Sequence, residues 1–257
     1  MKIIMRFVVV RLKYLVFGLI AVIAGTMLCL YSGQAVMTFL VGEREIPIYS
    51  VERDDAKLAI TFDCAWNDDD IDSIIKTLND SGVTATFFVT GKWAEDYSDS
   101  LNKLSRNGFE IGIHSYNHDD YTKMNENEII LDMEKCDKAV MRATGVKPQL
   151  ARVPSGAYNN TSVRTIERSG RACIQWSLDG LDYIQTTPEE IYNRIVPLAK
   201  SGDIILLHNG TKYTSQVLPK IIEKLKESYE LVNVSDLIYT KDYTIDHTGK
   251  QIKKVMY

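Results

Sequence analysis

Short β-branched runs alternate with amphipathic helical stretches along most of this chain, and this alternation constrains the fold more than any other feature. A strand, a helix and a second strand form a right-handed crossover between parallel strands. Seven such runs predict an α/β fold, a distorted (β/α) barrel with about seven parallel strands. An open doubly wound sheet is the alternative. The predicted strands are Leu58–Phe62, Thr84–Val89, Glu110–Ile113, Gln149–Val153, Ala172–Trp176, Asp203–Leu207 and Glu230–Val234.

The helical stretches between these strands define one domain. Asn67 and the acidic residues after it form the cap and first turn of the first helix, which the helix dipole favours. The domain is predicted to cover residues 57–240, with residues 43–56 as a connector and residues 241–257 as a polar C-terminal tail. The predicted helices cover residues 68–80, 93–107, 125–143, 160–169, 188–200 and 214–227.

The N-terminal segment has the pattern of a membrane anchor. Residues 14–42 contain no charged side chain, and these 29 residues exceed the roughly 20 that span a bilayer core. Four basic residues and no acidic residue lie in residues 1–13. The positive-inside rule then predicts a cytoplasmic basic stub, a transmembrane helix and an extracytoplasmic domain, in a single-pass protein of the cell membrane. A cleaved signal peptide and a buried core helix are the alternatives.

Composition excludes several classes of protein. With 45% apolar and 25% charged residues, the chain is neither disordered nor a small disulfide-dense scaffold. The net charge of −4 argues against a nucleic-acid partner. Three cysteines follow the predicted anchor, so at most one disulfide can form within the domain.

Titratable and cationic side chains stand at the ends of five of the seven predicted strands. Because parallel strands end at the same edge of the sheet, these side chains are expected to meet there, at the face where barrels build active sites. This pattern predicts an enzyme. The residues are Asp63, His114, Arg152, Asp182 with Asp179, and His208.

The strand-end residue His114 and the nearby His118 suggest metal chemistry. His114 and His118 lie four residues apart, and in a helical turn this spacing puts both imidazoles on one face. Two neutral imidazoles suit zinc when a third ligand and an open position are present. Two surface or capping histidines are the alternative.

The other strand-end residues allow more than one role. Asp63 can be a metal ligand, a general base or a helix cap, although Asn67 lies closer to the predicted helix start. His208 can be catalytic or a core histidine with its hydrogen bonds satisfied. Arg152 ends an apolar strand, and a buried guanidinium needs an anionic partner, for which a strand-end aspartate is the obvious candidate.

Five motifs, in this order, resemble those of the polysaccharide deacetylases of carbohydrate esterase family 4, the NodB-homology domain. The resemblance covers residues 57–237, and residues 46–51, 175–179 and 208–209 resemble its membrane-anchored, sporulation-associated branch. The motifs are Thr61-Phe62-Asp63-Cys64, His114-Ser115-Tyr116-Asn117-His118, Arg152-Val153-Pro154-Ser155-Gly156, Asp179-Gly180-Leu181-Asp182-Tyr183 and Leu206-Leu207-His208.

The resemblance implies metal-dependent hydrolysis of the N-acetyl group of an amino sugar, with release of acetate. The substrate would be a glycan of the cell wall or of the spore, which means peptidoglycan or a related polysaccharide. The reaction would then contribute to spore formation. His114 and His118 would hold a divalent metal, zinc or cobalt, which would acidify a bound water. Asp63 would be the general base, held ionised by Arg152.

The remaining motif residues would complete this site. His208 would be the general acid, tuned by Asp182. A backbone N–H near Ser155 would stabilise the oxyanion, and Leu206 would line the pocket for the acetyl methyl group. Tyr183 would form an aromatic wall.

Three positions depart from the family pattern. Cys64 replaces a metal-ligating aspartate, and its thiolate can ligate zinc or be a small buried residue. Tyr183 replaces a tryptophan, and Ser155 stands where an aromatic residue is common.

Two further functions are compatible with these residues. One is a membrane-anchored carbohydrate-binding protein that has lost catalysis, and the other is a metal hydrolase of a different ester or amide. Tyr116, Trp66 and Trp93 could line a glycan groove or pack in the core.

Overall fold

The computed structural model describes residues 44–184 and 187–254, together with residues 23, 26 and 27. The predicted anchor over residues 14–42 lies outside the described residues, apart from those three. Within the part of the chain that is described, no helix has the length and apolar character needed to cross a membrane. Residues from Glu45 onward form one compact unit.

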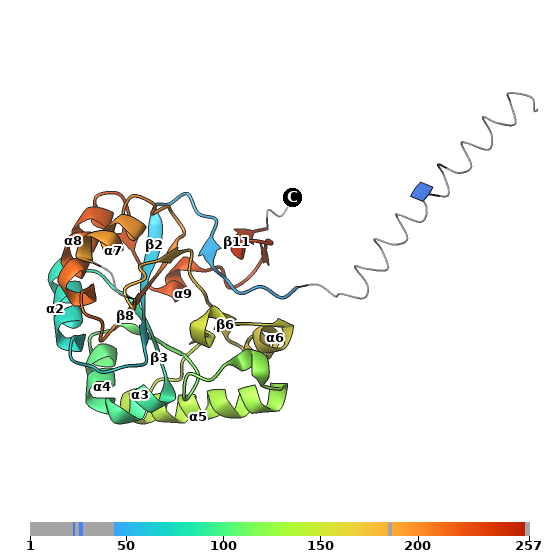
Figure 1. Cartoon of the computed structure of the whole chain (residues 1–257), viewed down its shortest axis with the longest axis horizontal. Coiled ribbons are helices and arrows are strands. Elements are labelled where there is room, and N and C mark those ends of the chain that lie inside the picture. Colours follow the sequence, from blue (N-terminus) through green and yellow to red (C-terminus); the bar gives the residue numbers. More distant parts are fainter. Residues whose placement is uncertain (1–22, 24–25, 28–43, 185–186, 255–257) are drawn as a thin grey trace, which may run out of the picture. The chain divides into compact units, whose positions relative to one another are not determined.

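A curved parallel sheet forms the centre of this unit (Figure 1). Its strands follow the order β6-β5-β4-β3-β2-β8-β7, and β9 pairs with the start of β2. In the described residues β6 and β7 end this path and do not pair with each other, so the predicted barrel is a half-barrel. The strands are β2 (Lys57–Cys64), β3 (Thr86–Val89), β4 (Glu110–Ile113), β5 (Leu150–Ala151), β6 (Ala172–Cys173), β7 (Leu178–Asp179), β8 (Ile204–His208) and β9 (Glu230–Leu231).

Helices cover the outside of the sheet, and their ends carry the expected signals (Figure 1). Asn125 and Glu128 form a capping box at the start of α5, and the left-handed Gly145 ends that helix. The helix predicted over residues 93–107 is divided at Tyr97, whose backbone is not helical. The helices are α2 (Ile71–Ser81), α3 (Gly91–Asp96), α4 (Ser98–Arg106), α5 (Glu126–Thr144), α6 (Asn160–Arg168), α7 (Pro188–Ile195), α8 (Thr214–Lys226) and α9 (Val234–Leu237).

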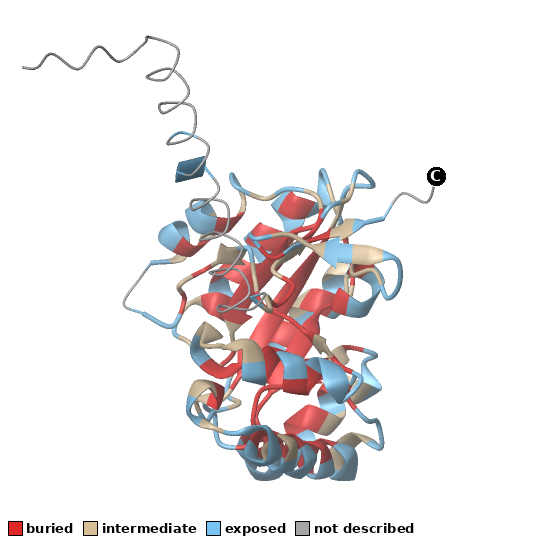
Figure 2. Ribbon diagram, turned by 90° about the vertical axis from the view of Figure 1, so that its right-hand side faces the viewer, coloured by how far each residue is buried: buried red, intermediate tan, exposed pale blue. Residues whose placement is uncertain are grey.

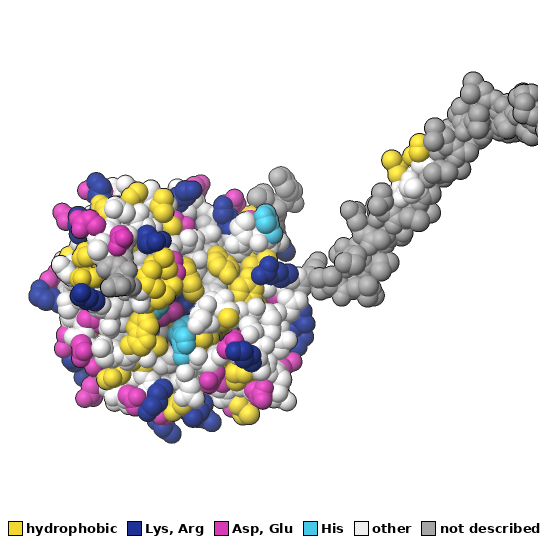
Figure 3. All heavy atoms as spheres, viewed as in Figure 1, with side chains coloured by type: hydrophobic (Ala, Val, Ile, Leu, Met, Phe, Trp, Pro, Cys, Tyr) yellow, Lys and Arg dark blue, Asp and Glu magenta, His cyan; other side chains and the backbone are white. Residues whose placement is uncertain are grey.

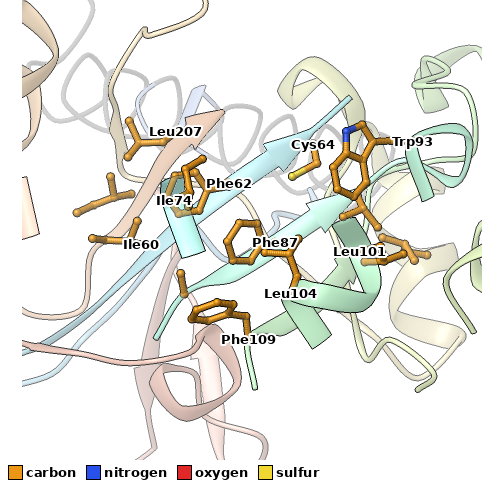
Figure 4. Close-up of a cluster of buried hydrophobic side chains, with 14 of the residues drawn as sticks. Ile60, Phe62, Cys64, Ile74, Phe87, Trp93, Leu101, Leu104, Phe109 and Leu207 are labelled. Carbon is orange, nitrogen blue, oxygen red and sulfur yellow. The ribbon is translucent and has the colours of Figure 1, made fainter. Parts of the chain in front are cut away.

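The main core lies between the sheet and these helices (Figures 2 and 4). Ile60 and Phe62 of β2 are fully buried there, and the ring of Phe62 stacks on that of Phe87 with centroids 4.9 Å apart. Burying each such side chain contributes about 1.5–3 kcal/mol. Alternate residues of the same strands, among them Ala59 and Phe88, belong to a second buried cluster.

The predicted connector and tail are parts of the domain. The strands β1 (Ser50–Val51), β11 (Lys250–Lys253) and β10 (Tyr243–Ile245) form a small three-stranded sheet. Ile48 and Gln251 are buried. Residues 243–253 of the predicted tail (241–257) thus lie in a sheet, where β11 pairs with β10 and with β1, about 200 positions earlier in the chain.

Two glycines with positive φ make a matched pair for testing this arrangement. A Cβ on Gly202 (φ +86°) would lie 1.7 Å from the carbonyl oxygen of Val51, whereas a Cβ on Gly82 (φ +61°) would meet nothing within 4 Å. We expect Gly82→Ala to cost about 1–2 kcal/mol through backbone strain alone. Gly202→Ala should cost several kcal/mol more, measured by denaturant unfolding of the full chain. Equal losses would contradict the close approach of Val51 to Gly202.

Candidate active site

A cavity of about 340 Å³ opens at the carboxyl ends of the central strands. Near the middle of the face shown in Figure 3, a histidine side chain lies among hydrophobic side chains. The cavity volume lies at the lower end of the range for small-ligand sites. It is lined by Asp63, Ala65, Trp66, His114, His118, Ser155, Trp176, Tyr183, Leu206 and His208.

Asp63 and Arg152 form a buried ion pair on the floor of this cavity. Nη1 of Arg152 donates to Oδ1 of Asp63 over 2.7 Å and to the hydroxyl of Thr61 over 2.9 Å. Its Nη2 donates to the carbonyl of Gln175, and the guanidinium lies 4.0 Å from the ring centroid of Phe88. The structure thus identifies Asp63 as the anionic partner that the sequence requires for Arg152.

This environment keeps Asp63 ionised. Burial by itself would raise the pKa of the carboxyl, but the charge of Arg152 and the nearby His114 and His208 outweigh it and lower the pKa. Asp63 therefore carries its negative charge at neutral pH. A carboxylate in this state can accept a proton.

His114 and His118 face the same carboxylate. His114 follows β4, and its Nδ1 lies 2.9 Å from the carbonyl oxygen of Arg152, which fixes Nδ1 as the protonated nitrogen. Its Nε2 lies 3.4 Å from Oδ2 of Asp63. The two imidazole rings meet edge to face with centroids 4.9 Å apart. Burial lowers the pKa of His114 to about 4 and also lowers that of His118, so both rings are neutral at pH 7.

The turn that carries these histidines is strained and is held from α5. Ser115 and His118 both have positive φ, 62° and 66°, so the turn is not the helical one that the spacing suggests. Asp132 of α5 accepts hydrogen bonds from the hydroxyl of Ser115, the backbone N–H of Tyr116 and the hydroxyl of Tyr121. Asp132 was not predicted as a site residue, because its polarity alone does not distinguish it from an exposed helix residue.

His208 ends β8 and is paired in register with Asp63 on β2, so both side chains project toward the same face. Its Nδ1 lies 2.8 Å from Oδ1 of Asp182, and its backbone N–H donates to Oδ2 of the same carboxylate. The hydroxyl of Thr214 also donates to Asp182. Asp182 thereby fixes the orientation of the imidazole.

The pKa of His208 moves in the opposite direction to that of Asp63. Burial would lower it, but the hydrogen bond to Asp182 and the negative charges of Asp63, Asp182 and Asp179 outweigh burial and raise it. His208 is therefore suited to carry a proton at neutral pH.

Aromatic and apolar side chains form the walls. The rings of Trp66 and Tyr183 adjoin His208, with centroid distances of 5.2 and 4.9 Å. Leu206 and Ser155 line the cavity as predicted, and Trp176, which was not predicted as a site residue, lines it as well. Its place at the end of a predicted strand was the available signal.

Comparison with known proteins identifies the family. The family model described as polysaccharide deacetylase matches residues 50–174. The Xyl-CE4 domain of a multidomain xylanase, from the hindgut metagenome of Trinervitermes trinervoides, is 33% identical. The match covers 72% of this chain and 90% of that one, with a TM-score of 0.66. The chain belongs to the polysaccharide deacetylase family.

Other members differ in what they are described as doing. The peptidoglycan-N-acetylglucosamine deacetylase PgdA of Listeria monocytogenes is 29% identical over 77% of this chain. BA3943 of Bacillus anthracis, described as a CE4 family pseudoenzyme, is 27% identical with a TM-score of 0.72, covering 74% of this chain and 68% of its own. The chain spans 60% and 42% of the lengths of the first two curated relatives that it matches.

The predicted metal ligand Cys64 does not face the cavity of this polysaccharide deacetylase domain. Its neighbour Asp63 points into the cavity, so Cys64 points to the opposite face of β2, where it is fully buried in the main core (Figure 4). Burial raises the pKa of its thiol well above the usual value. These observations contradict the prediction of a thiolate ligand.

The remaining donors are too few for a complete zinc site. No group of three His, Cys, Asp or Glu side chains that could hold a metal ion occurs within the described residues. The imidazoles of His114 and His118 are neutral and suited to ligation, but a catalytic zinc site has three protein ligands. The residues present therefore do not fit a fully protein-held zinc or cobalt ion.

Asp132 can be tested through stability. Asp132→Ala would leave three donors, on Ser115, Tyr116 and Tyr121, without their acceptor in a strained turn, and we expect a loss of about 2–4 kcal/mol. Urea unfolding of the full chain measures it. Glu134→Ala, at an exposed position of the same helix, is the control and should cost less than about 0.5 kcal/mol. Similar losses in the two variants would show that Asp132 does not hold the turn.

Proposed function

We propose that this domain hydrolyses the N-acetyl group of an amino sugar in peptidoglycan or a related polysaccharide. One observation carries the proposal. Asp63 and His208 are register partners in one cavity, and buried partners hold the first as an anion and favour the protonated form of the second. A base and an acid on opposite sides of a reacting amide are what its hydrolysis requires. The described activity of the Listeria relative supports the choice of substrate.

The chemistry follows from the two side chains. Asp63 takes a proton from a water molecule, whose oxygen forms a bond to the acetamide carbonyl carbon. A backbone N–H near Ser155 stabilises the oxyanion. His208 donates its proton to the nitrogen as the carbon–nitrogen bond breaks. Acetate and a free amino sugar leave, and Arg152 and Asp182 keep the two side chains oriented.

A second function has an observation of its own in its favour. Cys64 lies in the core, and the cavity lacks a third metal ligand among the described residues. A carbohydrate-binding protein impaired in catalysis needs no such ligand, and BA3943 is described as a pseudoenzyme of this family. The retained pairs Asp63–Arg152 and His208–Asp182 favour hydrolysis, since binding alone does not need an acid and a base.

The location of the domain is part of the proposal. The uncharged residues 14–42 after a basic stub support a single-pass protein of the cell membrane, with the domain on the extracytoplasmic side. The resemblance to the sporulation-associated branch supports a spore glycan as substrate. A zinc or cobalt ion held by His114 and His118 would need a further ligand from outside the described residues, and the assay below includes both metals.

The base is tested by Asp63→Asn. This variant keeps a hydrogen-bond acceptor for Arg152 but cannot take a proton, so acetate release should fall by about 10²–10⁴-fold. Release from peptidoglycan and from N-acetylglucosamine oligomers is measured on the full chain as purified, with a chelator, and with added Zn²⁺ or Co²⁺. Asp69→Asn, an exposed carboxylate in the next loop, is the control.

The results of this assay distinguish a hydrolase from a carbohydrate-binding protein. Undiminished release by Asp63→Asn would show that Asp63 is not the base. No release by the parent chain from any glycan under any of the metal conditions would favour the binding protein.

The acid is tested through the pH profile. His208 acts while protonated, so activity is lost as pH rises through its raised pKa. Asp182→Asn removes the hydrogen-bonded charge that raises this pKa, and the alkaline limb of kcat should move to lower pH. Asp179→Asn removes a charge that is not hydrogen bonded to His208, and should move the limb less. An unmoved limb in Asp182→Asn would remove His208 from the role of acid.

A further inference from the structure

Trp66 is an exposed aromatic side chain that the acid–base chemistry does not use. Its indole is 47% exposed, yet it lines the cavity beside His208. By contrast, Trp93 and Tyr116, the other two aromatic residues considered for a glycan groove, are 2% and 7% exposed. Packing in the core therefore accounts for those two side chains and not for Trp66.

The loop that carries Trp66 is anchored on two sides. The backbone carbonyl of Asn67 accepts hydrogen bonds from the indole N–H of Trp93 over 3.2 Å and from the side-chain amide of Asn209. Oδ1 of Asp70 accepts one from the backbone N–H of Gly210 over 2.8 Å. Because the loop is tethered, the half-exposed indole of Trp66 holds its apolar surface in one position while that surface is in contact with water. Such pre-organised apolar surface favours binding, since little conformational freedom is lost when a ligand covers it.

A sugar ring is the ligand that fits this surface. The face of a pyranose ring carries C–H bonds with partial positive charge, and the face of an indole is negative. The cavity of about 340 Å³ accommodates roughly one sugar unit, and Trp66 reaches from its lining to solvent. We propose that Trp66 is a stacking platform for the sugar unit next to the one whose acetamide reaches Asp63.

This inference rests on the proposed function only in taking a glycan as the ligand. It adds that the site recognises at least two linked N-acetylated sugar units, because Trp66 extends from the cavity lining to solvent, where a neighbouring unit would cover it. Tyr183 is 45% exposed, and its ring also adjoins that of His208, so this residue bounds the cavity near Trp66. An alternative role for Trp66 is to shield His208 from water, and the two roles affect different kinetic parameters.

Binding is measured apart from hydrolysis. Isothermal titration of full-length Asp63→Asn, with and without Trp66→Ala, uses N-acetylglucosamine and its tetrasaccharide as probes. We expect Trp66→Ala to weaken tetrasaccharide binding about fivefold to tenfold and to weaken monosaccharide binding less. Trp66→Phe should lose less. Leu131→Ala, which removes an exposed apolar side chain from α5, is the matched control and should change neither.

The outcomes separate this inference from the proposed function. Tetrasaccharide binding that is unchanged in Trp66→Ala, or absent in the parent, overturns the platform. Binding that depends on Trp66 in a chain that releases no acetate supports the platform while the proposed hydrolysis fails. In a chain that does release acetate, Trp66→Ala should raise KM and keep kcat within about twofold. A shifted alkaline limb of kcat with KM unchanged would instead assign Trp66 to shielding His208.

Discussion

The buried ion pair between Asp63 and Arg152 is the interaction on which the rest of the site depends. Taking two charges out of water costs several kcal/mol per ion unless hydrogen bonds and a close partner compensate. Here the guanidinium donates to Asp63, to the hydroxyl of Thr61 and to the carbonyl of Gln175. Arg152 directly follows β5, and Asp63 lies in β2. Because β4 and β3 separate these two strands in the sheet, the ion pair reaches across the concave side of the sheet. It therefore links the curvature of the half-barrel to the position of the base.

The period of the strand explains why the site and the core are so sharply divided. Along β2, Thr61 and Asp63 face the cavity side, whereas Phe62 and Cys64 join the main core. A residue next to the base in sequence cannot share its direction within a regular strand. The same rule places Leu206 and His208, the register partners of Thr61 and Asp63, on the cavity side. Polar chemistry and apolar packing thus alternate residue by residue.

The same rule also shows what could be predicted. The ends of parallel strands meet at one edge, so the strand-end positions of Asp63, His114 and His208 were enough to bring them together. The family motif left two roles open for Cys64, a zinc ligand and a small buried residue, and the alternation along β2 favours the second, because Cys64 follows Asp63 directly. Periodicity therefore gave the better prediction at that position.

Other features depended on partners distant in sequence. The pairing of Ser50 with Lys250 carries no local signal, because both residues are polar and the strands are short. Asp132 holds the turn that carries His114 and His118, and Trp66 is exposed on a loop. Both features depend on the backbone conformation of loops, which the periodicity of the sequence does not specify. Local patterns describe one element at a time, and these features exist only between elements.

The two catalytic candidates reinforce each other electrostatically. The positive charge of His208 helps to lower the pKa of Asp63, and the negative charge of Asp63 helps to raise that of His208. Between the two displaced pKa values, the base is ionised and the acid is protonated in the same molecule, which is the state that amide hydrolysis uses. Removing either charge would weaken the other group as well as delete its own proton transfer. The losses caused by Asp63 and His208 variants should therefore not be additive, as expected for residues that act as one unit.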